Sequence, residues 1–115
     1  MTHGVVERYL DAVATQDWDT MRATIRDDVV RIGPFGDVYS GLHYVEFLAG
    51  LMPTLPGYAM EVSRVTYVDD GRRAVAELSE TVTVDGSPLV TPEVLLFDLD
   101  ADGRIARVEI FTRRA

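Results

Sequence analysis

RRAVAELSETVTVDGSPLVTPEVLLFDLD, residues 72–100, consists of two strand-like halves joined by a turn. Both halves, 72–84 and 89–99, are rich in Val, Thr, Leu and Phe, which favour strands. In the first half the even positions from Ala74 to Val84 are apolar apart from Glu80, as in a strand with one buried face. The segment Asp85-Gly86-Ser87-Pro88 is typical of a hairpin connection. The pattern predicts two long antiparallel strands.

Two further stretches of similar composition flank this hairpin, at 58–68 and 104–112. They are separated from it by Asp69-Asp70-Gly71 and by Asp100-Ala101-Asp102-Gly103, which are again turn signals. A shorter strand is predicted earlier, at Val29–Ile32. The second half of the chain is therefore predicted to be a meander of four long strands.

Helical periodicity dominates the first half of the chain. One helical face carries Val5, Val6, Tyr9, Leu10 and Val13. Asp17 is the predicted N-cap of a second helix, and a third runs from about Gly41 until Pro53 stops it. The order is ααβαββββ, and helices segregated from antiparallel strands indicate a single α+β domain over residues 1–115.

The composition narrows the classes of function. A chain of 115 residues fits one domain. Lys and Arg total 11 against 19 Asp and Glu, a net charge of -8, which argues against a nucleic-acid or anionic-membrane surface. The absence of Cys excludes disulfides, thiol nucleophiles and Cys-ligated metals. No apolar run has the length of a membrane span and no signal-peptide pattern is present, so we expect a cytoplasmic protein.

Two acidic residues interrupt the apolar faces of the hairpin strands. Glu80 lies among the apolar even positions of 72–84, and Glu93 among the odd positions of 89–99. If the turn is Gly86-Ser87, the two glutamates lie directly opposite each other; a longer turn shifts them by a residue or two and leaves them near neighbours. Close carboxyl groups raise the pKa of one of them, which suits general acid–base catalysis. The alternative is a curved sheet whose rim exposes the acids or pairs them with arginines.

Tyr9 is a further candidate, because a buried tyrosine hydroxyl can donate to a developing oxyanion. The alternative is a core tyrosine bonded to a backbone carbonyl. His43, near the start of the third helix, is typical of a surface or capping residue. His43 and His3 have no metal-binding spacing, so we expect neither a metal nor a cofactor. The roles of His43 and Asp37 stay open at this point.

Four runs of residues resemble the N-terminal third of bacterial ketosteroid isomerases. They are Val5-Val6-Glu7-Arg8-Tyr9-Leu10, Asp17-Trp18-Asp19, Asp27-Asp28-Val29-Val30 and Pro34-Phe35-Gly36. Gly86 in the hairpin and Asp102-Gly103-Arg104-Ile105 in the last strand fit as well. The chain thus resembles the nuclear-transport-factor-2-like superfamily, which includes ketosteroid isomerases, SnoaL-like polyketide cyclases and small epoxide hydrolases. The resemblance implies a cone-shaped, curved antiparallel sheet with three N-terminal helices (a cystatin-like fold) around an apolar pocket.

The resemblance also assigns individual positions. The oxyanion-hole tyrosine of the isomerases falls on Tyr9, their general-base aspartate on Gly33, and their protonated aspartate near Leu95. Two of the three catalytic groups are therefore replaced, while Glu80 and Glu93 are expected to point into the pocket. The remaining predicted pocket residues are Trp18, Leu48, Met60, Leu78, Leu95, Val108 and Ile110.

Three functional hypotheses follow. The first is a cofactor-free, isomerase- or cyclase-like enzyme acting on a small apolar molecule by proton transfer, cyclisation or epoxide opening, with Tyr9, Glu80 and Glu93 as catalytic residues. The second is a non-catalytic ligand-binding module or dimeric scaffold of the same fold. The third is a pocket collapsed around the bulky side chains of Phe35, Phe47, Met52 and Met60. The resemblance implies a homodimer, with Val65, Tyr67 and Val75 on the expected outward faces of the sheet.

Overall fold

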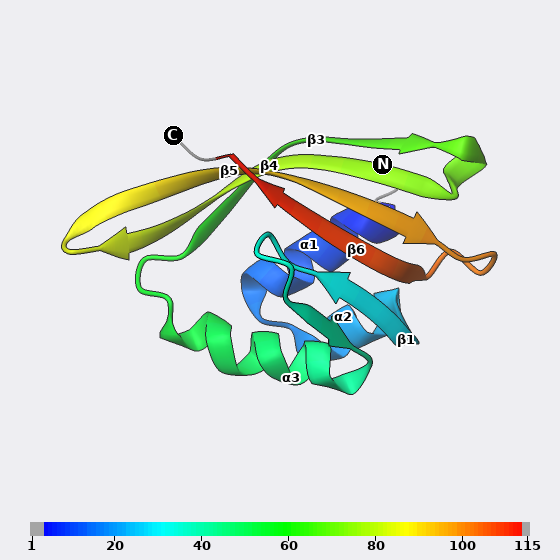
Figure 1. Cartoon of the computed structure of the whole chain (residues 1–115), viewed down its shortest axis with the longest axis horizontal. Coiled ribbons are helices and arrows are strands. Elements are labelled where there is room, and N and C mark those ends of the chain that lie inside the picture. Colours follow the sequence, from blue (N-terminus) through cyan, green and yellow to red (C-terminus); the bar gives the residue numbers. More distant parts are fainter. Residues whose placement is uncertain (1–3, 114–115) are drawn as a thin grey trace.

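Six strands form one curved sheet, and three helices lie on one face of it (Figure 1). The computed structural model describes residues 4–113, so His3 lies outside the described residues. The strand order across the sheet is β2-β1-β6-β5-β4-β3. In chain order the elements are α1 (Val5–Thr15), α2 (Trp18–Thr24), β1 (Ile25–Ile32), β2 (Val38–Ser40), α3 (Leu42–Leu51), the 3-10 turn η1 (Met52–Thr54), β3 (Ala59–Val68), the 3-10 turn η2 (Asp69–Gly71), β4 (Arg73–Val84), β5 (Ser87–Leu99) and β6 (Ile105–Thr112).

The α+β class and the nuclear-transport-factor-2-like arrangement are confirmed, with two corrections to the predicted topology. The prediction missed β2, a three-residue strand that returns along β1 after the turn at Gly33–Gly36. The sheet is mixed rather than wholly antiparallel, because β1 runs parallel to β6. A three-residue strand is too short to show a period, and strand direction is not encoded in the apolar pattern.

The β4–β5 hairpin corrects the predicted register of the two glutamates. Its turn is Asp85-Gly86, and both residues have positive φ (52° and 78°), as a two-residue hairpin turn of this hand requires. Asp-Gly tolerates that conformation better than the Gly-Ser turn assumed from the sequence. As a result Leu78 lies opposite Glu93, and Glu80 lies opposite Thr91. The glutamates remain on one face, related diagonally.

The core fills the space between the helices and the inner face of the sheet. α1 buries Val6 and Tyr9, α2 buries Met21, and β5 and β6 bury Phe97 and Val108. The ring of Tyr9 meets that of Phe97 edge to face, with centroids 5.7 Å apart at 76°. The sheet therefore closes against α1 at the Phe97 end.

Tyr67 of β3 caps the start of α1. The N-cap residue, Gly4, has no side chain to offer, and the Val6 N–H donates to the Tyr67 hydroxyl at 3.2 Å instead. The Tyr67 hydroxyl in turn donates to Glu7. Tyr67 and Val65 thus face inward, which corrects their predicted outward position; a bulge in β3 between Val62 and Arg64 shifts the alternation of the strand.

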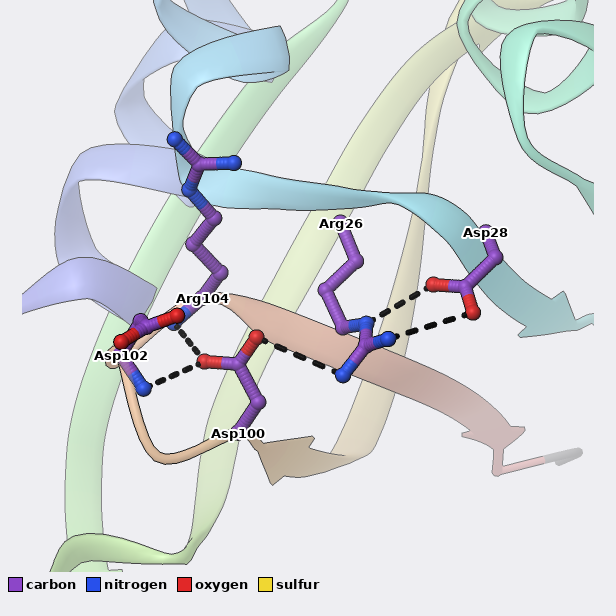
Figure 2. Close-up of polar contacts among 5 residues, drawn as sticks. All are labelled: Arg26, Asp28, Asp100, Asp102 and Arg104. Atoms are coloured by element: carbon purple, nitrogen blue, oxygen red, sulfur yellow. Dashed lines mark hydrogen bonds and ion pairs between the residues drawn. The ribbon is translucent and has the colours of Figure 1, made fainter.

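The turn between β5 and β6 is closed by Asp100 (Figure 2). Its Oδ1 accepts from the backbone N–H groups of Asp102 and Arg104, both at 2.9 Å. Arg26, at the start of β1, bonds Asp28 at 2.8 Å and reaches Asp100 at 3.6 Å. This cluster joins β1 to the beginning of β6, where the parallel pairing starts.

Among residues 4–113, every helix falls short of the length and apolarity that a membrane crossing requires.

Candidate functional site

A cavity of about 150 Å³ lies between α1, α3 and the inner face of the sheet. Its polar walls carry Tyr9, Arg31, Tyr44, Glu80 and Glu93. Its apolar walls include Leu48, Met60, Leu78, Leu95 and Ile110, five of the residues that the sequence predicted there. The structure therefore brings all three predicted catalytic residues to the wall of one cavity.

Two predicted pocket residues lie elsewhere. Val108 is fully buried opposite Phe97, at the end of the sheet that the Tyr9–Phe97 contact fills. Trp18 is the first residue of α2 and packs against the core from outside the cavity. Both residues were predicted from apolar periodicity, which marks a buried side chain but does not distinguish a cavity wall from solid packing.

The four bulky residues proposed to fill the pocket do not do so. Phe35 is 76% exposed, and Phe47 stacks on Tyr39 with ring centroids 4.0 Å apart. Met52 and Met60 form part of the cavity wall and leave the space open.

Glu80 and Glu93 form a hydrogen-bonded pair in the cavity wall. Burial raises the pKa of Glu93 from 4.5 to about 9, and the hydrogen bond and negative charge of Glu80 add to this, while the charge of Arg31 opposes it. The Tyr58 hydroxyl donates to Oε2 of Glu80. At neutral pH the pair therefore holds a proton, which the hydrogen bond places between the two carboxyl groups.

Tyr9 and Tyr44 lie side by side, and their hydroxyl groups hydrogen-bond to each other. Burial raises the pKa of Tyr9; the charge of Arg31 lowers it and that of Glu80 raises it. Both charges act on the Tyr9 hydroxyl, and the residue remains neutral. Because two hydroxyls share one hydrogen bond, one O–H of the pair stays available for an oxygen in the cavity.

Arg31 is the charged wall residue that sequence reasoning missed; Tyr44 was not predicted there either. Its side chain is 11% exposed, and its Nη1 donates to Asp37 at 2.8 Å. The guanidinium carbon lies 5.3 Å from the ring centroid of Phe47 and 5.9 Å from those of Tyr39 and Tyr44. Strand parity could have revealed it, since Arg31 lies two positions after the buried Val29 and so faces the same side.

Asp37 owes its position to a neighbouring glycine. A Cβ atom at Gly33 would lie 2.3 Å from Oδ1 of Asp37, so the carboxylate occupies the space of a missing side chain. The turn between them is closed by the Gly33 N–H, which donates to the Asp37 carbonyl at 2.8 Å. Asp37 can therefore reach Arg31 only because position 33 is a glycine.

His43 is exposed in the first turn of α3 and takes no part in the cavity wall. In the described range, 4–113, no three His, Asp or Glu side chains are grouped so that they could hold a metal ion.

The family model that describes SnoaL-like domain sequences matches residues 6–108 of this chain. The chain belongs to the SnoaL-like domain family. This places it in the nuclear-transport-factor-2-like superfamily, as the sequence predicted. No curated protein matches the chain in sequence.

Solved structures share the SnoaL-like fold over nearly the whole chain. A candidate polyketide cyclase from Xanthomonas campestris is 28% identical, with a TM-score of 0.75 over 93% of this chain and 86% of that one. A LEH-like epoxide hydrolase from M. tuberculosis is 22% identical, with a TM-score of 0.79 over 95% and 80%. A hypothetical protein from Catenulispora acidiphila with a ketosteroid isomerase-like fold, solved in complex with trimethylamine, is 12% identical, with a TM-score of 0.81 over 96% and 86%.

Proposed function

We propose that this SnoaL-like protein is a cofactor-free, isomerase- or cyclase-like acid–base enzyme that acts on a small molecule held in the cavity. The observation that carries the proposal is the hydrogen-bonded pair of Glu80 and Glu93 in the cavity wall, where the pKa of Glu93 is raised. A carboxyl group with a raised pKa can act as an acid near neutral pH while a neighbouring carboxylate acts as a base.

Glu80 is the proposed general base. It accepts hydrogen bonds from Tyr58 and Glu93. A carboxylate has about four lone-pair sites, so these two bonds leave it able to accept a proton from a substrate. Tyr58 itself stays protonated, because burial and the charge of Glu80 raise its pKa.

In the proposed reaction Glu80 removes a proton from a carbon next to a carbonyl group. The electron pair moves onto the carbonyl oxygen, where a hydroxyl of the Tyr9–Tyr44 pair donates to the developing oxyanion. Glu93 then gives its proton to the carbon or oxygen that receives it in the product. The proton that Glu80 gained passes to Glu93 through their hydrogen bond, which restores the starting state.

The same groups suit epoxide opening, the activity named for the M. tuberculosis neighbour. Glu80 would take a proton from water while Glu93 protonates the epoxide oxygen, so that one C–O bond forms as the other breaks. The polyketide cyclase described for the X. campestris neighbour favours the carbonyl reaction instead.

The competing function is a ligand-binding module without turnover. It is favoured by Gly33, which supplies no side chain at the position where the isomerases carry their base, and by Asp37, whose carboxylate is already paired with Arg31. In this hypothesis the glutamates only shape the cavity.

The test separates proton transfer from binding. Wild type, Glu80→Gln, Glu93→Gln and Tyr9→Phe are incubated in D2O with a panel of small ketones, and loss of the C–H signal next to the carbonyl is followed by NMR; an epoxide panel is followed by diol formation. Glu61→Gln, an exposed residue of β3, is the matched control. We expect turnover to fall by about 10² to 10⁴ in both cavity glutamine variants and to be retained in the control.

Turnover that survives in both Glu80→Gln and Glu93→Gln would remove them as the catalytic pair. Ligand binding that persists in all variants without any product would favour the binding module.

A further inference from the structure

The cavity has one positively charged wall. Arg31 lines the same space as Glu80 and Glu93, and its charge acts on both Tyr9 and Glu93. The chain as a whole carries a net charge of -8, so it repels anions at long range. A buried arginine is therefore the local feature that can hold a negatively charged group inside.

Arg31 has unused hydrogen-bonding capacity. Its one hydrogen bond within residues 4–113 runs from Nη1 to Asp37. Its Nε is buried and has no partner among these residues. Nη2 also makes no hydrogen bond within this range, and the edge of the guanidinium that carries it can donate to a carboxylate.

The aromatic rings around Arg31 fix the orientation of that edge. Arg31 lies opposite Tyr39 in the β1–β2 ladder, and Tyr39 stacks on Phe47 of α3. With Tyr44, these rings surround the guanidinium carbon at 5.3–5.9 Å. Because the rings and Asp37 hold the side chain in place, little rotamer entropy is lost when a ligand binds to it.

The size of the cavity limits what can bind. Its volume of about 150 Å³ is that of a cavity that encloses a benzene ring, whereas pockets for drug-sized ligands measure about 300–1,000 Å³. A fused multi-ring compound exceeds this volume and would extend out of the cavity.

We propose that the cavity binds a small carboxylic acid of about one six-membered ring, with its carboxylate on Arg31 and its ring among Leu48, Leu78 and Leu95. The opposite end of such a ligand lies towards Glu80 and Glu93. This inference deepens the proposed function, because it names the substrate class of the same site. It makes Arg31 a specificity-determining residue and Asp37 the residue that positions it.

The experiment compares ligands of equal shape and different charge. Benzoate, benzamide and 2-naphthoate are titrated into the wild-type protein by calorimetry, and amide shifts locate the site by NMR. We expect benzoate to bind at least about tenfold more tightly than benzamide, and 2-naphthoate to bind more weakly than benzoate. The shifts should centre on Arg31, Tyr44 and Leu78.

The variants assign this preference to one side chain. Arg31→Met removes the charge, and Arg31→Lys keeps the charge but loses the planar fork; both should diminish the ratio of benzoate to benzamide affinity. Arg64→Met is the matched control, since that exposed arginine pairs with Glu77. If Arg31→Met does not fold, the wild-type ligand comparison and Arg31→Lys decide.

Three results would overturn the proposal: no benzoate binding, equal affinity for benzoate and benzamide, or a preference undiminished by the Arg31 variants. Glu93→Gln separates this proposal from the enzymatic one. If the protein prefers benzoate while no variant of Glu80 or Glu93 changes turnover, the result supports the acid-binding site and refutes the catalytic role of the two glutamates.

Discussion

The carboxylate of Asp37 occupies the space that any side chain at position 33 would need. The distance from a Cβ at Gly33 to Oδ1 of Asp37 would be 2.3 Å, well inside a van der Waals contact. The same carboxylate holds Nη1 of Arg31 at 2.8 Å. The glycine is thus required by a neighbouring side chain, since its own backbone lies outside the left-handed region.

Gly33→Ala should destabilise the protein by about 1–2 kcal/mol, because the new methyl group displaces Asp37 from Arg31. In an Asp37→Ala background the same substitution should cost little, and urea unfolding of the four proteins gives the coupling energy. Gly50→Ala is the control; it lies in α3 with open space around it and should stabilise by about 0.5–1 kcal/mol. A cost of Gly33→Ala that is equal with and without Asp37 would refute the packing relationship.

Stability should depend on pH through Glu93. The folded state raises the pKa of this carboxyl from 4.5 to about 9, so its contribution is fully present below about pH 4.5 and is lost as the pH rises towards 9. Relative to Glu93→Gln, the wild type should lose roughly 1–3 kcal/mol of unfolding free energy over this window, since solvent screens part of the shift.

Urea unfolding at a series of pH values measures this difference, and carboxyl NMR locates the midpoint for Glu93. A midpoint near 4.5, together with parallel stability profiles for the two proteins, would show that the carboxyl is solvated and unpaired.

Tyr67→Phe should destabilise the first turn of α1. It removes the hydroxyl that accepts from the Val6 N–H and donates to Glu7, and the loss of these bonds should cost about 1 kcal/mol. Burial raises the pKa of Tyr67 to about 12, so the hydroxyl is neutral throughout the usual pH range. Hydrogen exchange of the first turn of α1 should accelerate. Tyr39→Phe removes a hydroxyl from an aromatic stack and leaves that turn unchanged; similar exchange in both variants would contradict the cap.

Asp100→Ala should cost more than Arg26→Ala, although the two side chains pair with each other (Figure 2). Asp100 also accepts two backbone N–H groups of the β5–β6 turn, whose loss should cost about 1–2 kcal/mol. Arg26 makes exposed ion pairs, which contribute little to stability and are screened by salt. Thermal unfolding in low and high salt compares the two variants. If both lose the same stability and both losses depend on salt, this ranking is contradicted.

The homodimer stays a prediction, and the outer face of the sheet is where it can be tested. Val94, Leu96 and Phe111 are 38–47% exposed there, and Val94 lies opposite Phe111 in the β5–β6 ladder. A second copy covering this face would bury them. We expect Leu96→Lys to shift a dimer towards monomer by light scattering, and a wild type that is monomeric at all concentrations would end this prediction.

The elements with long, regular patterns were predictable from the sequence. The apolar face of α1, the Asp17 cap of α2 and the four long strands all lie within a few residues of their predicted positions. The sequence predicted that Glu80 and Glu93 are near neighbours but not that they are related diagonally. Their register depends on which two residues form the hairpin turn.

The charged wall of the cavity was not predicted. Parity with the buried Val29 could have placed Arg31 on the inner face of β1, but it does not show that the residue borders a cavity. The surroundings of the Arg31 side chain depend on Tyr39 and Phe47. Tyr39 belongs to β2, which is too short to predict, and Phe47 belongs to α3. Such a site depends on tertiary contacts between segments that carry no joint signal in the sequence.

The parallel pairing of β1 with β6 also sets the order in which the molecule can be assembled. Arg31 lies beside Val108 in this ladder, 77 residues further along the chain, whereas β4 and β5 meet across a two-residue turn. Closing so large a loop is slow, so we expect amides of the β4–β5 hairpin to gain protection during refolding before those of β1. The carboxyl pair would then be in place early, and Arg31 would join it in the cavity wall later in folding.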